Sequence, residues 1–362
     1  MKKTSSIRKL AFGSLLFLNV LSLGIFVVRG KHRWILWFQD LRSSVRSARS
    51  HGVPESVLFA MSYVDTRFRL HRDYGRIAWI RMLPWRPERA VTSAFLAESD
   101  VDVSTILRNP EMSLRATAQN LAAKFDFSLN DPAILENWRA PLERWQNLDF
   151  SVNDKLYADH VLQLVNTGFA GVEDHGVPIE IKGWSQKLAA YRPTSGDRPK
   201  EFLGIPALPY LAGSPLASPT FPPERRQVTH IVVHTTENDF FSSLDYLMRP
   251  TTGVGAHYMV RAHDGFAVQL ADERRPVFHD ACFNDNSIGI EHEAYSGNGS
   301  LWFSDRMYRA SAKIAREIAE RYHIPLDREH ILGHSETPDC SDHEDPGPQW
   351  DWDKYMSYVR EG

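Results

Sequence analysis

The sequence has few cysteines and little excess charge, and both shortages narrow the possible functions. Only two cysteines occur in 362 residues, and neither closely follows the N-terminal apolar run, which argues against a lipoprotein. The formal net charge is −3, and no long run of like charge is present. This balance argues against nucleic acid or an anionic membrane surface as the main partner.

The composition and length are those of a globular protein with about two domains. Hydrophobic residues make up 43% and charged residues 24% of the chain, and no internal repeat is visible. A chain of this composition is expected to fold into packed domains rather than to be disordered or fibrous.

The first 30 residues have the pattern of an export signal. Basic residues occur between Lys2 and Lys9, and residues 10–28 are apolar except for Ser14, Asn19 and Ser22. The apolar run reaches Arg29 without a clear cleavage site, which favours an uncleaved signal anchor. A cleaved signal peptide is the alternative. Both predict an exported protein, periplasmic or extracellular, and the uncleaved form predicts an anchor in the inner membrane through residues 10–28.

A proline-rich stretch, residues 192–226, predicts a linker because repeated prolines prevent a helix or a central strand. It separates a predicted domain of residues 40–190 from one of residues 227–362. The first domain is expected to be all-α, with helices over 54–66, around 114–125 and over 155–166. The second alternates strand-like runs near residues 229–234, 257–261 and 287–291 with helices over 241–248 and 304–322, which predicts an α/β class.

Three residues of the second domain could form a metal site. His234 ends an apolar run, His334 follows Gly333, and Asp345 begins the sequence Asp-Pro-Gly-Pro. Catalytic zinc typically has three protein ligands and one open position, and it suits amide hydrolysis because it activates water and polarises a carbonyl. Each residue alone is a weak signal, since a single histidine at a strand end is usually structural.

Together with their neighbours these residues resemble the zinc-dependent N-acetylmuramoyl-L-alanine amidases, a family that also includes the peptidoglycan recognition proteins. The resemblance extends from about Gln227 to Val359. It lies in Val232–Thr235, Gly255–Tyr258, His279–Ala281, Asn286–Glu291, Gly333–Glu336 and Asp345–Pro348. It implies a central mixed sheet flanked by helices, with His234, His334 and Asp345 as ligands of Zn²⁺. Because recognition proteins that only bind peptidoglycan usually lack a complete metal site, the resemblance favours an enzyme.

The same resemblance implies roles for other residues of the domain. Glu291 would be the general base and acid, and His343 would stabilise the developing oxyanion. The predicted substrate-binding residues, which would line the pocket or pack beneath it, are His257, His279, Tyr258 and Trp350. The expected reaction cleaves the amide bond between N-acetylmuramic acid and L-alanine in peptidoglycan or muropeptides. A peptidoglycan-binding receptor with little catalysis remains an alternative.

The N-terminal domain shows a looser resemblance to lytic transglycosylases and goose-type lysozymes. The resemblance lies mainly in Ala48–Leu58 and Ala60–Phe68, where Asp65 occupies the position of the catalytic glutamate of that family. Aspartate is one methylene shorter, and a general acid must reach the glycosidic oxygen. We therefore expect a lysozyme-like domain that holds the glycan, with a bifunctional enzyme or a helical spacer as alternatives.

The two cysteines, Cys282 and Cys340, fall in segments near the predicted metal site. If the family resemblance holds, both loops converge on the metal, and an exported protein can keep a disulfide. A Cys282–Cys340 bridge is therefore expected. Free thiols, or Cys340 as a zinc ligand, are the alternatives.

Overall fold

The computed structural model describes residues 51–68, 110–146, 150–172, 178–193, 203–212, 227–337 and 343–361. The predicted export segment lies outside these residues, and no helix within them is long and apolar enough to cross a membrane. The chain divides into two compact units. The first comprises Met1–Met61 and Leu70–Ala133, and the second comprises Ser62–Arg69 and Ile134–Gly362. The second unit therefore combines part of the predicted helical domain with the predicted amidase domain.

Three described helices before residue 170 lie within a few residues of the predicted positions: α2 (Glu55–Thr66), α5 (Pro110–Ala123) and α7 (Ser151–Thr167). A fourth helix, α6 (Arg139–Gln146), was not predicted. In the second unit α6 and α7 pack through Leu142, Trp145 and Tyr157, all almost completely buried. The rings of Trp145 and Tyr157 stack with centroids 5.7 Å apart, so aromatic packing fixes this pair of helices.

A β-hairpin follows α7, so the all-α prediction for residues 40–190 is wrong at this point. Strands β1 (Gly168–Val172) and β2 (Pro178–Lys182) pair antiparallel. The first strand has two glycines among five residues and gives no alternating apolar pattern, which explains why sequence periodicity missed it. In the second strand Ile179 and Ile181 alternate with polar residues, and this short alternation was the sequence signal that could have indicated a strand.

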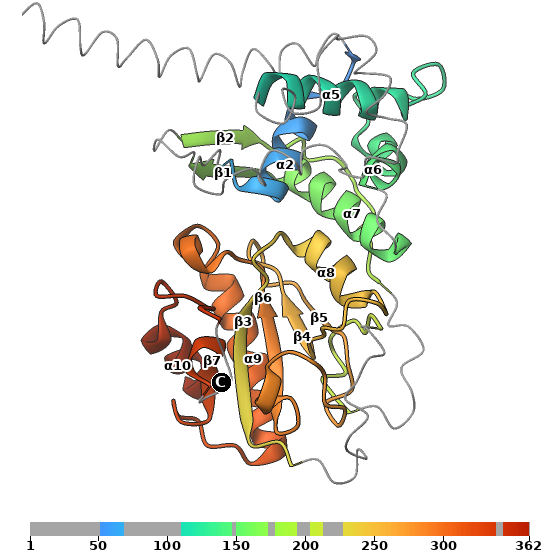
Figure 1. Cartoon of the computed structure of the whole chain (residues 1–362). Coiled ribbons are helices and arrows are strands. Elements are labelled where there is room, and N and C mark those ends of the chain that lie inside the picture. The colour runs from blue at the N-terminus through green and yellow to red at the C-terminus, as the bar shows by residue number, and fades with distance from the viewer. Residues whose placement is uncertain are drawn as a thin grey trace, which may run out of the picture. The chain divides into compact units, whose positions relative to one another are not determined.

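A five-stranded mixed sheet forms the centre of the C-terminal region (Figure 1), as predicted. The spatial order is β5 (Ala267–Gln269), β4 (Tyr258–Val260), β6 (Ser287–His292), β3 (His230–Thr235) and β7 (Ile331–Gly333). Only β5 is antiparallel to its neighbour. The parallel strands therefore end at one edge of the sheet, where side chains from separate segments can meet.

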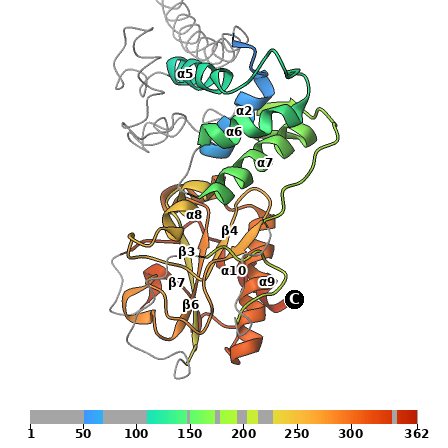
Figure 2. The ribbon, with the colours of Figure 1, turned by 90° about the vertical axis from the view of Figure 1, so that its right-hand side faces the viewer.

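Two helices, α9 (Asp305–Tyr322) and α10 (Trp352–Glu361), cover one face of this sheet (Figure 2). Helix α9 begins at the predicted place because the Ser304 hydroxyl accepts a hydrogen bond from the Met307 N–H at 3.1 Å. Its apolar stripe packs against Ile231 and Val233 of β3 and against Ile288 of β6. The residues that alternate with these along each strand therefore lie on the other face of the sheet, away from α9 and α10.

Part of the predicted linker lies against the free edge of β5. The Gln269 N–H donates to the Pro209 carbonyl, and the Leu211 N–H donates to the Gln269 carbonyl, each at 2.9 Å. The Gln269 side chain also bonds to the backbone of Leu203 and Ile205. This stretch thus extends the sheet edge by local pairing although its prolines exclude a regular strand.

Candidate metal centre and active site

His234 and Glu291 are placed side by side by strand register. β3 and β6 run parallel, and His234 pairs with Glu291. Directly paired residues lie on the same face of a sheet. Because Ile231 and Val233 pack toward α9, His234 and Glu291 belong to the opposite face, at the carboxyl ends of their strands.

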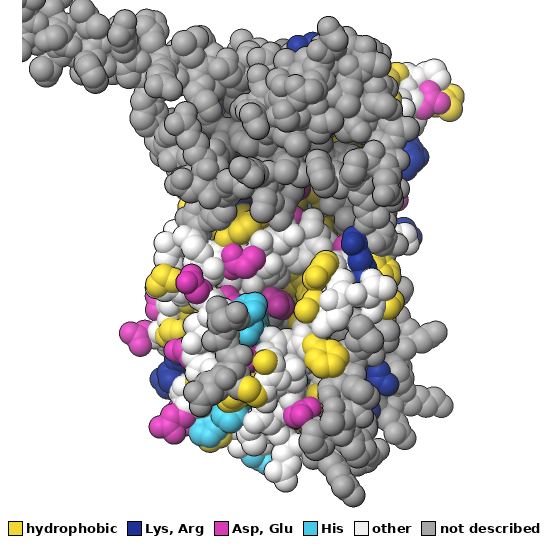
Figure 3. Space-filling model, viewed as in Figure 1, with side chains coloured by type: hydrophobic (Ala, Val, Ile, Leu, Met, Phe, Trp, Pro, Cys, Tyr) yellow, Lys and Arg dark blue, Asp and Glu magenta, His cyan; other side chains and the backbone are white. Residues whose placement is uncertain are grey.

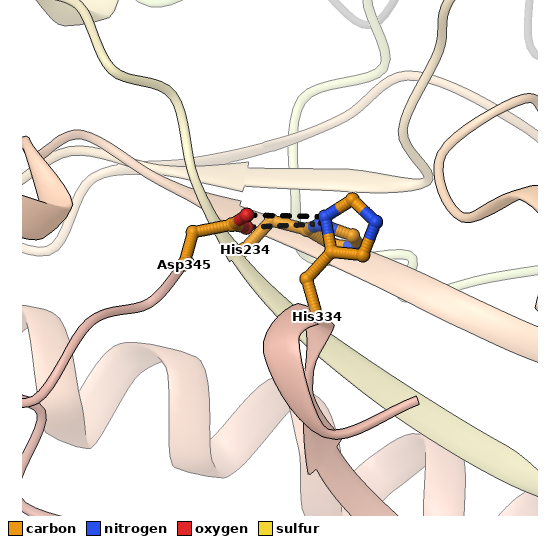
Figure 4. Close-up of side chains that lie close together, drawn as sticks. All are labelled: His234, His334 and Asp345. Carbon is orange, nitrogen blue, oxygen red and sulfur yellow. Dashed lines mark hydrogen bonds and ion pairs between the residues drawn. The ribbon is translucent and has the colours of Figure 1, made fainter. Parts of the chain in front are cut away.

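His334 and Asp345 complete a cluster around His234 (Figure 4). His334 follows β7, which pairs with β3, and Asp345 lies in the segment before α10. The Nδ1 atoms of His234 and His334 are 3.1 Å apart. The Asp345 carboxylate oxygens are 3.2 Å from His234 Nδ1 and 3.1 Å from His334 Nδ1. The side chains therefore point their donor atoms at one another from three separate segments.

This spacing fits a metal ion. Zinc bonds of about 2.0–2.1 Å in tetrahedral geometry place neighbouring ligand atoms about 3.3 Å apart, close to the distances in the cluster. The three residues are almost completely buried. Burial alone would raise the pKa of Asp345, but hydrogen bonds with His234 and His334 together hold it well below its usual range. Burial lowers the pKa of His234. A carboxylate and neutral imidazole are the forms that bind metal.

The second nitrogen of each imidazole also has a neighbour. His234 Nε2 shares a hydrogen bond of 3.0 Å with His279 Nδ1, and His334 Nε2 lies 3.7 Å from Asp280 Oδ1. Such outer partners fix the tautomer and orientation of ligating histidines. Asp280 was not among the predicted site residues. Its place directly after His279 in a matching motif was the signal that could have indicated it.

Glu291 is the neighbouring acid-base candidate. Its Oε2 atom is buried and has no hydrogen-bond partner among the described residues. Burial, with smaller effects of the Asp345 and Glu237 charges, raises the pKa of Glu291 to about 8. The carboxyl can therefore exchange a proton near neutral pH.

The other predicted site residues lie at different depths. His343 is exposed, and its ring stacks on that of His334 with centroids 4.2 Å apart. His257 is fully buried. Its Nδ1 accepts a hydrogen bond from the Gly289 N–H, so Nε2 carries the proton and donates to the Arg275 carbonyl.

Tyr258 and Trp350 are also buried. The Tyr258 hydroxyl donates to Glu273, and Trp350 packs against His292 with ring centroids 4.7 Å apart.

On the face of the molecule seen in Figure 3, histidine, acidic and hydrophobic side chains lie together at the surface. Substrate contact by the predicted binding residues stays a prediction.

Two further predictions concern Asp65 and the cysteines. Asp65 is only 7% exposed, and it lies in the second unit beside Tyr157, whose pKa is raised by burial and by the Asp65 charge. Cys282 is disulfide-bonded, as expected. The other cysteine of the sequence, Cys340, lies outside the described residues.

Residues 224–348 match the family model described as N-acetylmuramoyl-L-alanine amidase. N-acetylmuramoyl-L-alanine amidase A of Achromobacter lyticus is 26% identical in an alignment of 165 residues that covers 41% of this chain and 93% of that protein. Among solved structures, the amidase AmiD from E. coli in complex with an anhydro-N-acetylmuramic acid peptide is 27% identical, with a TM-score of 0.31. That match covers 39% of this chain and 60% of the other.

AmpDh3 from Pseudomonas aeruginosa is 23% identical with a TM-score of 0.31, and the match covers 43% of this chain and 66% of the other. The family match falls on the region that contains His234, Glu291 and His334. Residues 224–348 are thus similar to N-acetylmuramoyl-L-alanine amidases.

Proposed function

We propose that the C-terminal region is a zinc-dependent N-acetylmuramoyl-L-alanine amidase, which cleaves the amide bond between N-acetylmuramic acid and L-alanine in peptidoglycan or its fragments. One observation carries the proposal. Three buried metal-type donors, on His234, His334 and Asp345, converge beside the carboxyl group of Glu291. The family match to residues 224–348 supports the same reaction.

The donor set fits a catalytic zinc site. Two imidazoles and one carboxylate are a ligand set typical of zinc hydrolases, and it leaves the fourth position for water or substrate. A bound zinc ion supplies Lewis acidity, which lowers the pKa of water and polarises a carbonyl. The Thr235 N–H donates to Asp345 Oδ2 at 3.2 Å and holds the carboxylate toward the two histidines. Completeness of this set favours an enzyme over a receptor that only binds.

Glu291 is suited to move protons between water and the leaving amine. Its Oε2, which has no hydrogen-bond partner in the described part of the chain, can take a proton from the attacking water and later donate it to the amine nitrogen of L-alanine. A pKa raised by burial to about 8 keeps both forms accessible near neutral pH. The carboxyl therefore serves first as general base and then as general acid.

His343 is suited to stabilise the oxyanion. It is 61% exposed at the edge of the cluster, with Nδ1 3.5 Å from Asp345 Oδ1. A ring N–H aimed at the carbonyl oxygen of the substrate would stabilise the charge that develops there. The exposure of His343 leaves room for a substrate to approach the metal ligands from the solvent side.

We further infer that the protein is exported, supported by the basic and apolar pattern of residues 1–28. This would bring the site to peptidoglycan, which lies outside the cytoplasm. For the lysozyme-like region we propose glycan contact without glycan cleavage, since Asp65 is both one methylene short and almost completely buried.

Metal analysis tests the site. Purified protein should contain about one zinc per chain, because a complete three-ligand site binds tightly. A His334→Ala variant should lose most of this metal and the hydrolysis of muramyl dipeptide, whereas the control His330→Ala, outside the cluster, should keep both. Near-full zinc content in His334→Ala would refute the ligand assignment.

A further inference from the structure

A buried arginine of the N-terminal half contacts a buried glutamate beside the proposed active site. Arg67, at the end of α2, and Glu293, just after β6, both belong to the second unit. Arg67 Nη2 lies 3.2 Å from Glu293 Oε2, and the two side chains are 6% and 1% exposed. The guanidinium also lies over the Trp302 ring, 4.7 Å from its centroid. Nearly complete burial makes this ion pair different from the surface pairs of the domain.

Arg67 is itself fixed by the end of its helix. Its Nη1 donates to the carbonyls of Tyr63 at 2.8 Å and Val64 at 3.2 Å. The Tyr63 carbonyl also accepts from the Arg67 backbone N–H at 2.9 Å, so the guanidinium adds a second bond there and one to the buried Val64 carbonyl. These bonds to the end of α2, together with the Glu293 carboxylate, give the side chain a defined position.

Glu293 joins several segments at the carboxyl edge of the sheet. Its Oε1 accepts from the Phe240 N–H at the start of α8 (Phe240–Met248) at 3.2 Å. Its Oε2 accepts from the Ala262 N–H, two residues after β4, at 2.8 Å. The Glu293 N–H donates to the Val260 carbonyl at 2.9 Å. The Glu293 carboxyl group thus fixes the segments that follow β4 and β6 and the beginning of α8.

Glu293 is also linked directly to the residues proposed for catalysis. It follows Glu291 by two residues, and the Nδ1–H of His292 between them donates to the His234 carbonyl at 2.8 Å. The Thr236 N–H donates to the His292 carbonyl at 3.0 Å. A shift of Glu293 would therefore be transmitted to both strand ends, β3 with His234 and β6 with Glu291.

We propose that Arg67 is a positioning residue of the amidase site: it neutralises Glu293, and the Arg67–Glu293 pair holds the end of β6 so that Glu291 stays oriented toward its substrate. The expected fall in turnover rests on the proposed amidase function. The expected structural change at the end of β6 does not. The pair gives the segment Ser62–Phe68, which lies outside the family match, a role in amide hydrolysis.

The test compares full-length variants on muramyl dipeptide. In Arg67→Met, Glu293 is left as a buried charge without its counterion. We expect kcat to fall about ten- to a hundredfold, since small displacements of a reacting group have effects of this size, with KM and zinc content near wild type. The double variant Arg67→Met/Glu293→Gln removes the uncompensated charge and should regain part of kcat while staying below wild type.

A matched control is Arg321→Met, which also removes the partner of a buried carboxylate. Arg321 Nη1 lies 2.6 Å from Glu273, which is fully buried, but Arg321 belongs to α9 and Glu273 follows β5, so neither residue lies in β6 or at its end. This variant should lose stability and keep its kcat. An equal fall of kcat in the control would show a general effect of lost stability and would overturn the proposal.

Amide hydrogen exchange gives a readout independent of turnover. Exchange at Phe240 and Ala262, whose N–H groups donate to Glu293, should become faster in Arg67→Met and stay at the wild-type rate in Arg321→Met. A wild-type protein without amidase activity would refute the proposed function while exchange still tests the ion pair. If Arg67→Met fails to fold, the double variant decides: wild-type kcat and wild-type exchange there would overturn the positioning role.

Discussion

Replacing Glu291 by glutamine should improve stability while it removes activity. The carboxyl is the acid-base group of the proposed reaction, and glutamine has a similar shape but cannot take up a proton. Turnover should fall by about two orders of magnitude or more, the usual range for removing a general acid or base. Zinc content should stay near wild type because Glu291 is not a ligand.

The gain in stability follows from the raised pKa. Burial raises the pKa of Glu291 from 4.5 to about 8, so the folded state binds this proton more tightly than the unfolded chain. The free energy of unfolding therefore falls as the pH rises from about 4.5 to about 8. At about 1.4 kcal/mol per pKa unit the upper limit is about 5 kcal/mol. Because the side chain is partly exposed, we expect about half of this.

Denaturant unfolding of metal-free protein at pH 5 and pH 8 measures the effect. Glu291→Gln should gain about 2 kcal/mol or more over wild type at pH 8 and much less at pH 5. The control Glu329→Gln removes an exposed carboxyl and should show no such difference. An equal change in unfolding free energy at both pH values in Glu291→Gln would refute the reasoning.

Three other predictions concern groups away from Glu291. Burial, aided by the Arg67 charge, lowers the pKa of His263 from 6.5 to about 4. The free energy of unfolding should therefore decrease as the pH falls from about 6.5 to about 4. Between pH 7 and pH 4.5, denaturant unfolding should show a smaller decrease for His263→Gln than for wild type. Equal declines would contradict this. Unreduced protein should take up no thiol-alkylating label at Cys282 in intact-mass measurements, and uptake would contradict the disulfide. Glycan strands should stay uncut, so reducing-end or anhydro-sugar products that vanish in Asp65→Ala would contradict a non-cleaving domain.

Sequence periodicity was sufficient to predict the helices and strands that bury one face or all of their side chains. The stripe of α9 and the apolar run of β3 predicted both elements within about a residue of their ends. The hairpin β1–β2 was missed because its first strand consists largely of small residues. Register could not be read from periodicity, yet it is register that places His234 beside Glu291.

The surroundings of the site were harder to predict than its central residues. His234, His334 and Asp345 occur in motifs of recognisable order, and the structure brings them together. The Arg67–Glu293 pair joins residues 226 positions apart, and neither lies in a motif that indicates an ion pair. Asp280 and Glu293 act through tertiary neighbours, which local sequence patterns do not specify.

The most direct test of the amidase assignment is the mass of the products released from purified muropeptides. Wild-type protein should release free stem peptides and leave N-acetylmuramic acid sugars intact, chelator should stop the release, and added zinc should restore it. Release of shortened glycans without free stem peptides, or release of stem peptides that persists after complete removal of metal, would contradict a zinc-dependent N-acetylmuramoyl-L-alanine amidase.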